Sequence, residues 1–138
     1  MQRVTTARSA TSHRPQESAQ AAVEFALVLP ILCLILFAII KFGMAFWTYQ
    51  QVSAAASEGA RRASISRTYT DRTTRVQTAA RSSAPNLTAS SMTVTTTSAW
   101  TPGSPVTVRV SYPQNITVMG VTFFNGSLSA TRTFRVEQ

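Results

Sequence analysis

One unbroken run of apolar residues dominates the sequence. It begins at Phe25, continues to Ile40 and, interrupted by a single charge at Lys41, reaches Trp47. A helix over about residues 25–47 rises about 1.5 Å per residue and is long enough to cross a hydrocarbon layer of about 30 Å. The indole ring of Trp47 is of the kind that prefers the membrane–water interface. The pattern therefore predicts one transmembrane helix.

The helical pattern continues beyond the apolar run. From Gln50 to Ser64 the only helix breaker is Gly59, so we expect one long helix over about residues 20–66. Small side chains recur along it at helical spacing: Val52, Ala55, Ala56, Gly59, Ala60 and Ala63. We expect this stripe to pack on the protein's own sheet, with packing against the helices of other subunits as the alternative.

A short second helix is predicted within residues 67–90, which otherwise form a linker. Thr70 or Asp71 is its expected N-cap, and Pro85 ends it after about Ser83. Its apolar face consists of Val76, Ala79 and Ala80.

The C-terminal third alternates between apolar and polar residues with a period of two, which is typical of strands. Residues 92–98 and 106–112 are the arms of a predicted hairpin, with a turn rich in Pro and Gly at residues 101–105. A last strand, Leu128 to Val136, carries Arg132 among its apolar positions, which indicates an edge strand or a bulge.

The connection before that last strand, Pro113 to Ser127, contains more apolar surface than a solvated loop needs. We expect it to supply a fourth strand. Contact with the membrane or with a partner subunit is the alternative, which would be abandoned if Phe123→Ser and Phe124→Ser left assembly intact. The predicted fold class is α+β, with a three- or four-stranded antiparallel sheet over residues 91–138.

The net charge of +8 suits anionic lipid headgroups, cell-surface polymers or nucleic acid. Part of it lies on the predicted second helix, where Arg72, Arg75 and Arg81 extend a basic run. We expect these arginines to form a solvated face, with a footprint for DNA or lipid as the alternative.

Groups that could carry catalysis are scattered. His13 lies near the N-terminus, Cys33 lies in the middle of the apolar run, and the acids have no spacing that suggests a pair or a metal site. A single cysteine cannot form an intrachain disulfide. We therefore expect a protein that is not an enzyme and that needs neither a metal nor another cofactor.

The chain begins with a basic segment, Met1 to Gln16, that is rich in Ser and Thr and is interpreted as a disordered leader. An ordinary secretory signal peptide is the alternative, since residues 54–56 offer an A-x-A match, but the apolar run is longer than an ordinary signal requires. Glu24 stands at the entrance of that run. An ionised group there costs about 2–3 kcal/mol unless it reaches water or a cation.

Two blocks of sequence carry a resemblance to a known family. Ala19-Gln20-Ala21-Ala22-Val23-Glu24-Phe25-Ala26-Leu27-Val28-Leu29-Pro30 resembles the processing site and hydrophobic start of the TadE-like pseudopilins of the bacterial Tad (Flp) pilus system. Ser57-Glu58-Gly59-Ala60-Arg61-Arg62-Ala63 resembles the second signature of that family, an "EGAR" block. The resemblance implies a pilin-like fold.

The resemblance also implies how the N-terminus is processed. A prepilin peptidase would cut after Ala19, where the family usually has glycine, and would remove residues 1–19. Gln20 would become the N-terminus, with Glu24 fifth and Phe25 sixth. The new α-ammonium group could then neutralise the Glu24 of a neighbouring copy, whereas a carboxylate that snorkels into the headgroups is the alternative.

Pro30, Gly59 and Arg61 are further candidates for packing and assembly. Pro30 leaves the carbonyl of Ala26 without its helical partner, so we expect a kink or a loosened turn there. Gly59 and Arg61 belong to the second signature, and a side-chain pair between Glu58 and Arg61 or Arg62 is its simplest explanation.

By this resemblance the protein is a minor pilin or pseudopilin that helps initiate or cap a Tad pilus for surface adhesion and biofilm formation. It would be held in the inner membrane by one span, with its C-terminal domain outside, and could enter the pilus. The implied partners are the major Flp pilin, a companion minor pilin, the prepilin peptidase and the inner-membrane platform.

The sequence leaves three other functions open. The first is a DNA-binding component of a DNA-uptake pilus, and the second is a plain single-pass surface protein. The third is a eukaryotic glycoprotein, because the pattern N-x-S/T occurs at Asn86, Asn115 and Asn125.

Overall fold

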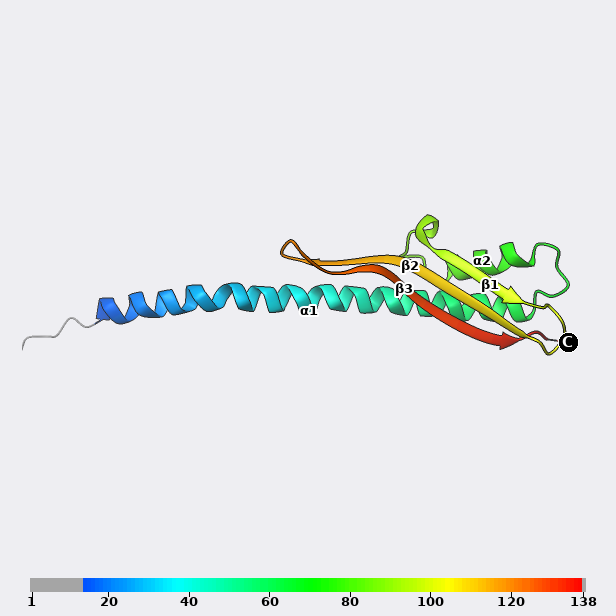
Figure 1. Ribbon diagram of the computed structural model, residues 1–138, viewed down its shortest axis with the longest axis horizontal. Helices are drawn as coiled ribbons and strands as arrows, with labels where there is room; N and C mark the ends of the chain where they lie inside the picture. The colour runs from blue at the N-terminus through cyan, green and yellow to red at the C-terminus, as the bar shows by residue number, and fades with distance from the viewer. Residues whose placement is uncertain (1–13, 138) are drawn as a thin grey trace, which may run out of the picture. The chain divides into compact units, whose positions relative to one another are not determined.

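The computed structural model describes residues 14–137, and the side chains from residue 17 onward. Two compact units divide the chain, one ending at Leu36 and the other beginning at Phe37. Helix α1, Arg14–Ser64, contributes to both units (Figure 1). The second unit adds helix α2, Arg72–Ser82, the short 3-10 helix η1, Ala89–Ser91, and three strands. The α+β class predicted from the sequence is confirmed.

The first unit, over its described residues, is a single helix. It is helical from Arg14, so the prediction that the disordered leader extends to Gln16 is wrong; proline is tolerated in the first turn of a helix and does not delay its start. The rest of the predicted leader lies outside the described residues. Helical structure also continues through Pro30 without a break.

The second unit is built on an antiparallel sheet in the order β1-β2-β3. Strand β1, Thr93–Ser98, pairs with the first half of β2, Pro105–Val118, from Ser98↔Val106 to Thr93↔Ser111. Strand β3, Val121–Arg135, pairs with β2 over its whole length. The predicted hairpin of β1 and β2 is therefore confirmed, as is the last strand.

The expected fourth strand is wrong. Residues 113–127 instead lengthen β2 and β3 into one long hairpin that turns at Met119 and Gly120. Both turn residues have positive φ, 49° and 84°, as the two-residue turns that match the twist of a hairpin require. Pro113 is tolerated within β2 because it lies beyond the last pair with β1, where one edge of β2 is free.

The core forms where β2 and α2 meet α1. Every residue of the small stripe on α1 is buried, which confirms that the stripe packs within the protein. Val106, Val108 and Val110 of β2 are fully buried, as are Val76 and Ala80 of α2. A Cβ atom at Gly59 would lie only 3.2 Å from Val108 Cγ1 and 3.3 Å from Ala80 Cβ, so the absence of a side chain there allows all three elements to approach.

Strand β3 is an edge strand, as Arg132 indicated. Arg132 is paired with the buried Val108, yet it remains exposed and donates from Nη2 to Ser53 Oγ of α1 at 2.8 Å. The one irregularity of the β2–β3 ladder lies elsewhere, between Ile116 and Thr117. An arginine on the inner face is tolerated here because the open edge lets its guanidinium reach water.

Helix α2 agrees with its prediction to within a residue at each end. Asp71 occupies the N-cap position, but its side chain makes no capping hydrogen bond. Val76 and Ala80 point into the core, whereas Ala79 is only half-buried. The Glu137 backbone nitrogen donates a hydrogen bond to the Ser64 carbonyl at 2.9 Å. This bond connects the residues after β3 to the end of α1.

Candidate processing and assembly site

The predicted processing residues all lie on the first unit, in α1. Ala19, Gln20, Glu24 and Phe25 are exposed, and the exposed fraction of Phe25 is 61%. Gln20 Nε2 donates to Glu24 Oε1 at 3.0 Å across one helical turn. The helix thus already brings the residue that would become the new N-terminus beside the carboxylate.

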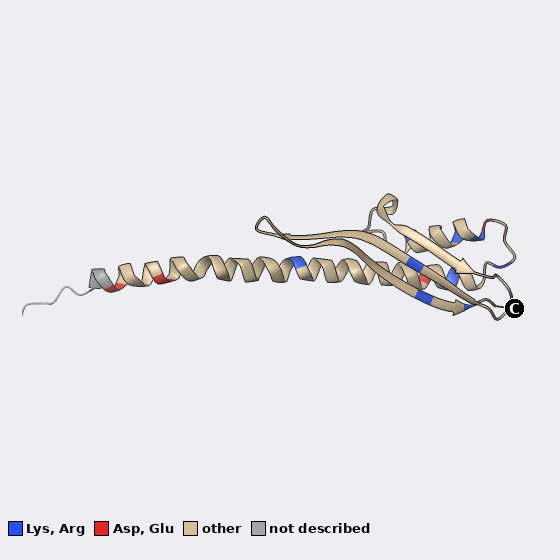
Figure 2. Cartoon of the chain, viewed as in Figure 1, with Lys and Arg blue, Asp and Glu red and all other residues tan. Residues whose placement is uncertain are grey.

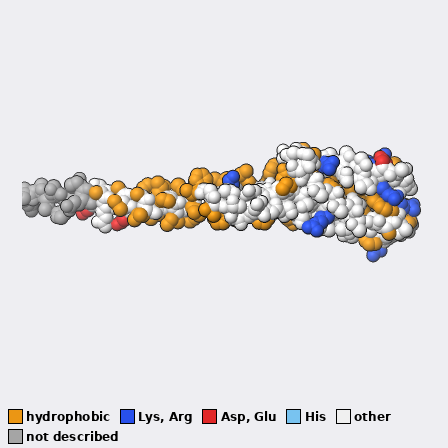
Figure 3. Space-filling model, turned by 45° about the horizontal axis from the view of Figure 1, so that its top comes forward, with side chains coloured by type: hydrophobic (Ala, Val, Ile, Leu, Met, Phe, Trp, Pro, Cys, Tyr) orange, Lys and Arg blue, Asp and Glu red, His pale blue; other side chains and the backbone are white. Residues whose placement is uncertain are grey.

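The helix that follows is apolar on all sides. Its most apolar window has a mean hydropathy of 2.9, and none of that window is buried within the protein. Figure 3 shows hydrophobic side chains along this part of α1, whereas Lys and Arg side chains gather on the second unit. Length, composition and exposure therefore make α1 a candidate membrane span, because its surface has no cover of its own.

Pro30 lies within this apolar segment, where its nitrogen cannot donate to the carbonyl of Ala26. The helix nevertheless continues to both sides of it. The kink or loosened turn expected from the sequence remains a prediction.

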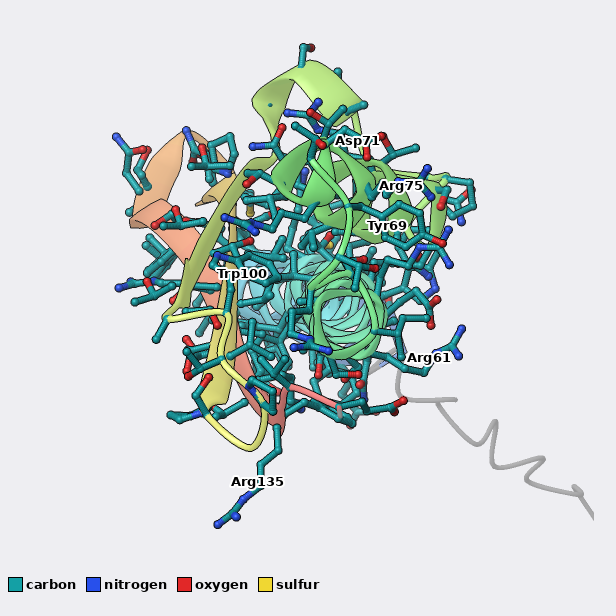
Figure 4. All side chains as sticks on the ribbon, turned by 90° about the vertical axis from the view of Figure 1, so that its right-hand side faces the viewer. Arg61, Tyr69, Asp71, Arg75, Trp100 and Arg135 are labelled. Atoms are coloured by element: carbon teal, nitrogen blue, oxygen red, sulfur yellow. The ribbon has the colours of Figure 1, made fainter. Side chains whose placement is uncertain are left out.

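Gly59 and Arg61 of the second signature lie two residues apart and have opposite surroundings. Gly59 is buried between Val108 and Ala80, as described above. Arg61 is exposed, and Figure 4 shows its side chain directed away from the core. The signature therefore combines one position that allows close packing with one position on the surface.

Glu58 and Arg61 form the side-chain pair that the sequence indicated. Arg61 donates from Nε to Glu58 Oε2 at 2.9 Å and from Nη2 to Glu58 Oε1 at 2.8 Å. These two bonds from a cation hold the pKa of Glu58 below its usual range, although partial burial opposes the shift. The pair lies on the surface, so it orients Arg61 more than it stabilises the fold.

The contacts that engage the arginines of α2 were not predicted from the sequence. Arg75 Nε donates to Asp71 Oδ1 at 2.8 Å, which lowers the pKa of Asp71, and the Arg75 guanidinium lies 4.0 Å from the centroid of the Tyr69 ring. Arg72 lies 4.9 Å from the centroid of the Trp100 ring. Figure 4 shows Tyr69, Asp71 and Arg75 grouped together.

The contact between Asp71 and Arg75 could have been predicted from the sequence, because the two residues are four apart at the start of a predicted helix. The contact of Arg72 with the Trp100 ring could not have been predicted in this way, since the two residues are distant in sequence. Arg72 and Arg75 are therefore not the simple solvated face that was expected, and both are partly occupied by contacts within the chain. Arg81 remains exposed.

An open groove of about 360 Å³ lies between the end of α1 and α2. Glu58, Arg62, Asp71 and Arg75 supply its charges. The two carboxylates already accept hydrogen bonds from arginines of the same chain. Over residues 14–137, no three His, Cys, Asp or Glu side chains gather as metal ligands would.

A long exposed apolar helix that continues into a small α+β unit defines a class of candidate membrane-anchored proteins. Within that class, residues 19–61 match the family model described as TadE-like protein. The match contains the first sequence block and the second one as far as Arg61, and it confirms the resemblance seen in the sequence. It associates the protein with the Tad pilus. No curated protein and no solved structure matches the chain.

Proposed function

We propose that this protein is a minor pilin of a Tad pilus, a structural subunit that helps to initiate or cap the filament rather than an enzyme. The observation that carries the proposal is the family match over residues 19–61, which joins the processing block to the buried glycine of the second signature. In this role the apolar part of α1 is the assembly element, and the α+β part of the second unit lies mainly outside the membrane.

Processing after Ala19 would create the charge that assembly needs. The exposed carboxylate of Glu24 lies one helical turn from Gln20, so a new α-ammonium group at Gln20 lies within reach of Glu24 on its own or on an adjacent copy. Within a low-dielectric environment such a pair is attractive, whereas an unpaired Glu24 is costly. Glu24 therefore favours the addition of a subunit whose own N-terminus has been cut.

The same role accounts for orientation and partners. The subunit is held in the inner membrane with its N-terminus inside and its α+β unit outside, and it then passes into the extracellular pilus. Its direct contacts are the prepilin peptidase at Ala19, the major Flp pilin and a companion minor pilin along α1, and the inner-membrane platform. Loosening near Pro30 would let α1 adjust between bilayer and filament.

DNA binding is not favoured as a second function. Arg72 and Arg75, which would be its main phosphate contacts on α2, are engaged by Trp100, Tyr69 and Asp71. A salt-dependent affinity for DNA that is lost when the arginines of α2 are replaced would reverse this judgement.

The first experiment is to determine the N-terminal residue of the membrane-extracted protein, by intact mass, in cells with and without the prepilin peptidase. We expect a start at Gln20 only when the peptidase is present. An intact leader would instead indicate an uncleaved membrane anchor, and a start near Ser57 would indicate an ordinary secreted domain. Either result would overturn the proposal.

A matched pair of variants tests the charge. Glu24→Ala should still be cut but should fail to restore pili in cells that lack the protein. Glu17→Ala removes an acid that the cut would discard, so it should restore them fully. Equal restoration of pili by both variants would contradict the role of Glu24.

A further inference from the structure

The long hairpin of β2 and β3 ends in a segment without charge. We call residues 113–127 the distal hairpin; it lies beyond the reach of β1, whose last pair is Thr93↔Ser111. The sequence carries no charged residue between Arg109 and Arg132. In Figure 2 this part of the hairpin is tan throughout, while blue residues lie nearer the open end of the strands.

One face of the distal hairpin is covered by α1. Ile116 and Val118 lie on the same face of β2 as Val108, and they are only 6% and 2% exposed. On α1, Ala45 is 7% exposed although its neighbour Phe46 is 63% exposed. The distal hairpin therefore covers α1 near Ala45.

Simple dimensions agree with this placement. Val108 lies against Gly59, and ten residues of strand from Val108 to Val118 span about 33 Å. The distance along α1 from Gly59 back to Ala45 is only about 21 Å. Even with the strand inclined to the helix, the turn of the hairpin reaches α1 residues that belong to the apolar segment.

The turn and the start of β3 also expose large apolar side chains. Met119, Val121 and Phe123 are more than half exposed, and Phe124 is more than a third exposed. Met119 also has a φ of 49°, where Asn or Gly would sit with less strain. A methionine in this conformation makes the turn about 1 kcal/mol less stable than glycine would. The chain thus carries apolar surface at a position that backbone conformation alone would not select.

We propose that the tip of the distal hairpin is a second membrane contact, which dips into the acyl chains of the bilayer leaflet that also surrounds residues 41–47 of α1. The proposal rests on α1 spanning the membrane. Lys41 and Trp47 are residue types that sit at the boundary between headgroups and acyl chains. The absence of charge on the distal hairpin removes the usual barrier to such contact.

The depth of this contact is limited by the free edges of the strands. Beyond Ser111, β2 has no partner on the β1 side, so its backbone groups there need water or headgroups. Asn115 and Asn125, which form a pair across the hairpin, are exposed and also favour a polar environment. Only the turn, residues 118–124, therefore enters the acyl region.

The test uses the full chain reconstituted in vesicles of phosphatidylethanolamine and phosphatidylglycerol. Cys33→Ser removes the native thiol, Val121→Cys provides a new one, and an environment-sensitive NBD label is attached to it. We expect a blue-shifted label that loses most of its fluorescence to a nitroxide on the upper acyl chain and little to iodide in the water. Thr131→Cys, on the exposed face of β3, is the matched control and should respond in the opposite way.

A label on the native Cys33 of the unaltered chain tests whether α1 spans the membrane. This measurement is independent of whether the hairpin tip contacts the bilayer. Quenching from lipid at Cys33 but only from iodide at position 121 would overturn the membrane contact and leave the anchor intact. Protection of position 121 from both quenchers would also overturn it, because a second copy of the chain would then cover the tip. No quenching from lipid at Cys33 would overturn the anchor as well, and with it the proposed function.

Discussion

Gly59 is the residue on which the packing of the second unit depends most directly. The atoms nearest to its missing side chain belong to Val108 of β2 and Ala80 of α2, so a larger residue would push two elements away from α1 at once. Gly43, on the same helix, has no neighbouring atom within 4 Å of the corresponding position. The two glycines therefore differ in their surroundings and not in their backbone.

We expect Gly59→Val to lower the free energy of unfolding by about 1–3 kcal/mol relative to Gly43→Val, because only the former overfills a packed site. The helical cost of valine is common to both variants and cancels in the comparison. Chemical denaturation in detergent micelles, followed by near-UV circular dichroism, measures the difference. Equal stability of the two variants would show that the elements around Gly59 move apart at little cost, which would contradict the predicted overfilling.

The stability that the Glu58–Arg61 pair contributes should depend on pH. The pKa of Glu58 is lowered in the folded protein by its bonds from Arg61, so the pair contributes stability above the ordinary pKa of glutamate, about 4.3, and loses it as the pH falls through the lowered value. The advantage of the wild type over Glu58→Gln should be present at pH 7 and should disappear in strong acid. Thermal unfolding of both proteins across the acid range measures it, and a difference independent of pH would refute the role of the pair.

At the scale of elements, the turn between β2 and β3 decides the length of the hairpin. Met119 and Gly120 both have positive φ, and they allow Val118 and Val121 to pair directly. The strands can therefore continue to the turn instead of separating into a loop. The bulge between Ile116 and Thr117 is the only interruption of this ladder.

Substitutions at the turn should change hairpin stability in opposite directions. Met119→Asn should stabilise it by about 1 kcal/mol, because asparagine tolerates the left-handed region better than methionine does. Gly120→Ala should destabilise it by about 1 kcal/mol for the converse reason. Amide hydrogen exchange at Val118 and Val121 reports both changes. Slower exchange in Gly120→Ala than in the wild type would contradict the assigned turn geometry.

At the scale of the whole molecule, the buried contacts lie almost entirely in the second unit. The main core cluster begins at Val52 on α1 and includes residues of α2 and all three strands. The exposed apolar part of α1 contributes none of these residues. The α+β unit should therefore fold without the apolar segment of α1.

A chain that begins at Gln50 should be folded in detergent-free buffer, with the pairs of β1 and β2 intact by nuclear magnetic resonance. Because it lacks Ala45, it should also lose amide protection at Ile116 and Val118, whose cover on α1 is gone. Loss of protection throughout the sheet would contradict the independence of this unit. Unchanged protection of the distal hairpin would show that α1 does not cover it.

Much of this architecture could be read from the pattern of side chains alone. The apolar run, the small stripe of α1, the short α2 and the alternation in β1 and in β3 each have a local period that reports which face is covered. The pairing of Glu58 with Arg61 was visible for the same reason, since it lies within one helical turn. The processing residues were found through a family resemblance, and their cleavage remains a prediction.

Contacts between residues that are distant in the sequence were decided only by the tertiary structure. The apolar surface of residues 113–127 predicts a separate strand, yet the turn at Met119 makes these residues two halves of one hairpin. Arg72 on Trp100 and Gly59 against Val108 likewise join segments whose separation no local period records. The sequence by itself thus determined the elements and their buried faces, through periodicity. Only the three-dimensional structure determined which faces meet, because register and approach depend on backbone geometry far along the chain.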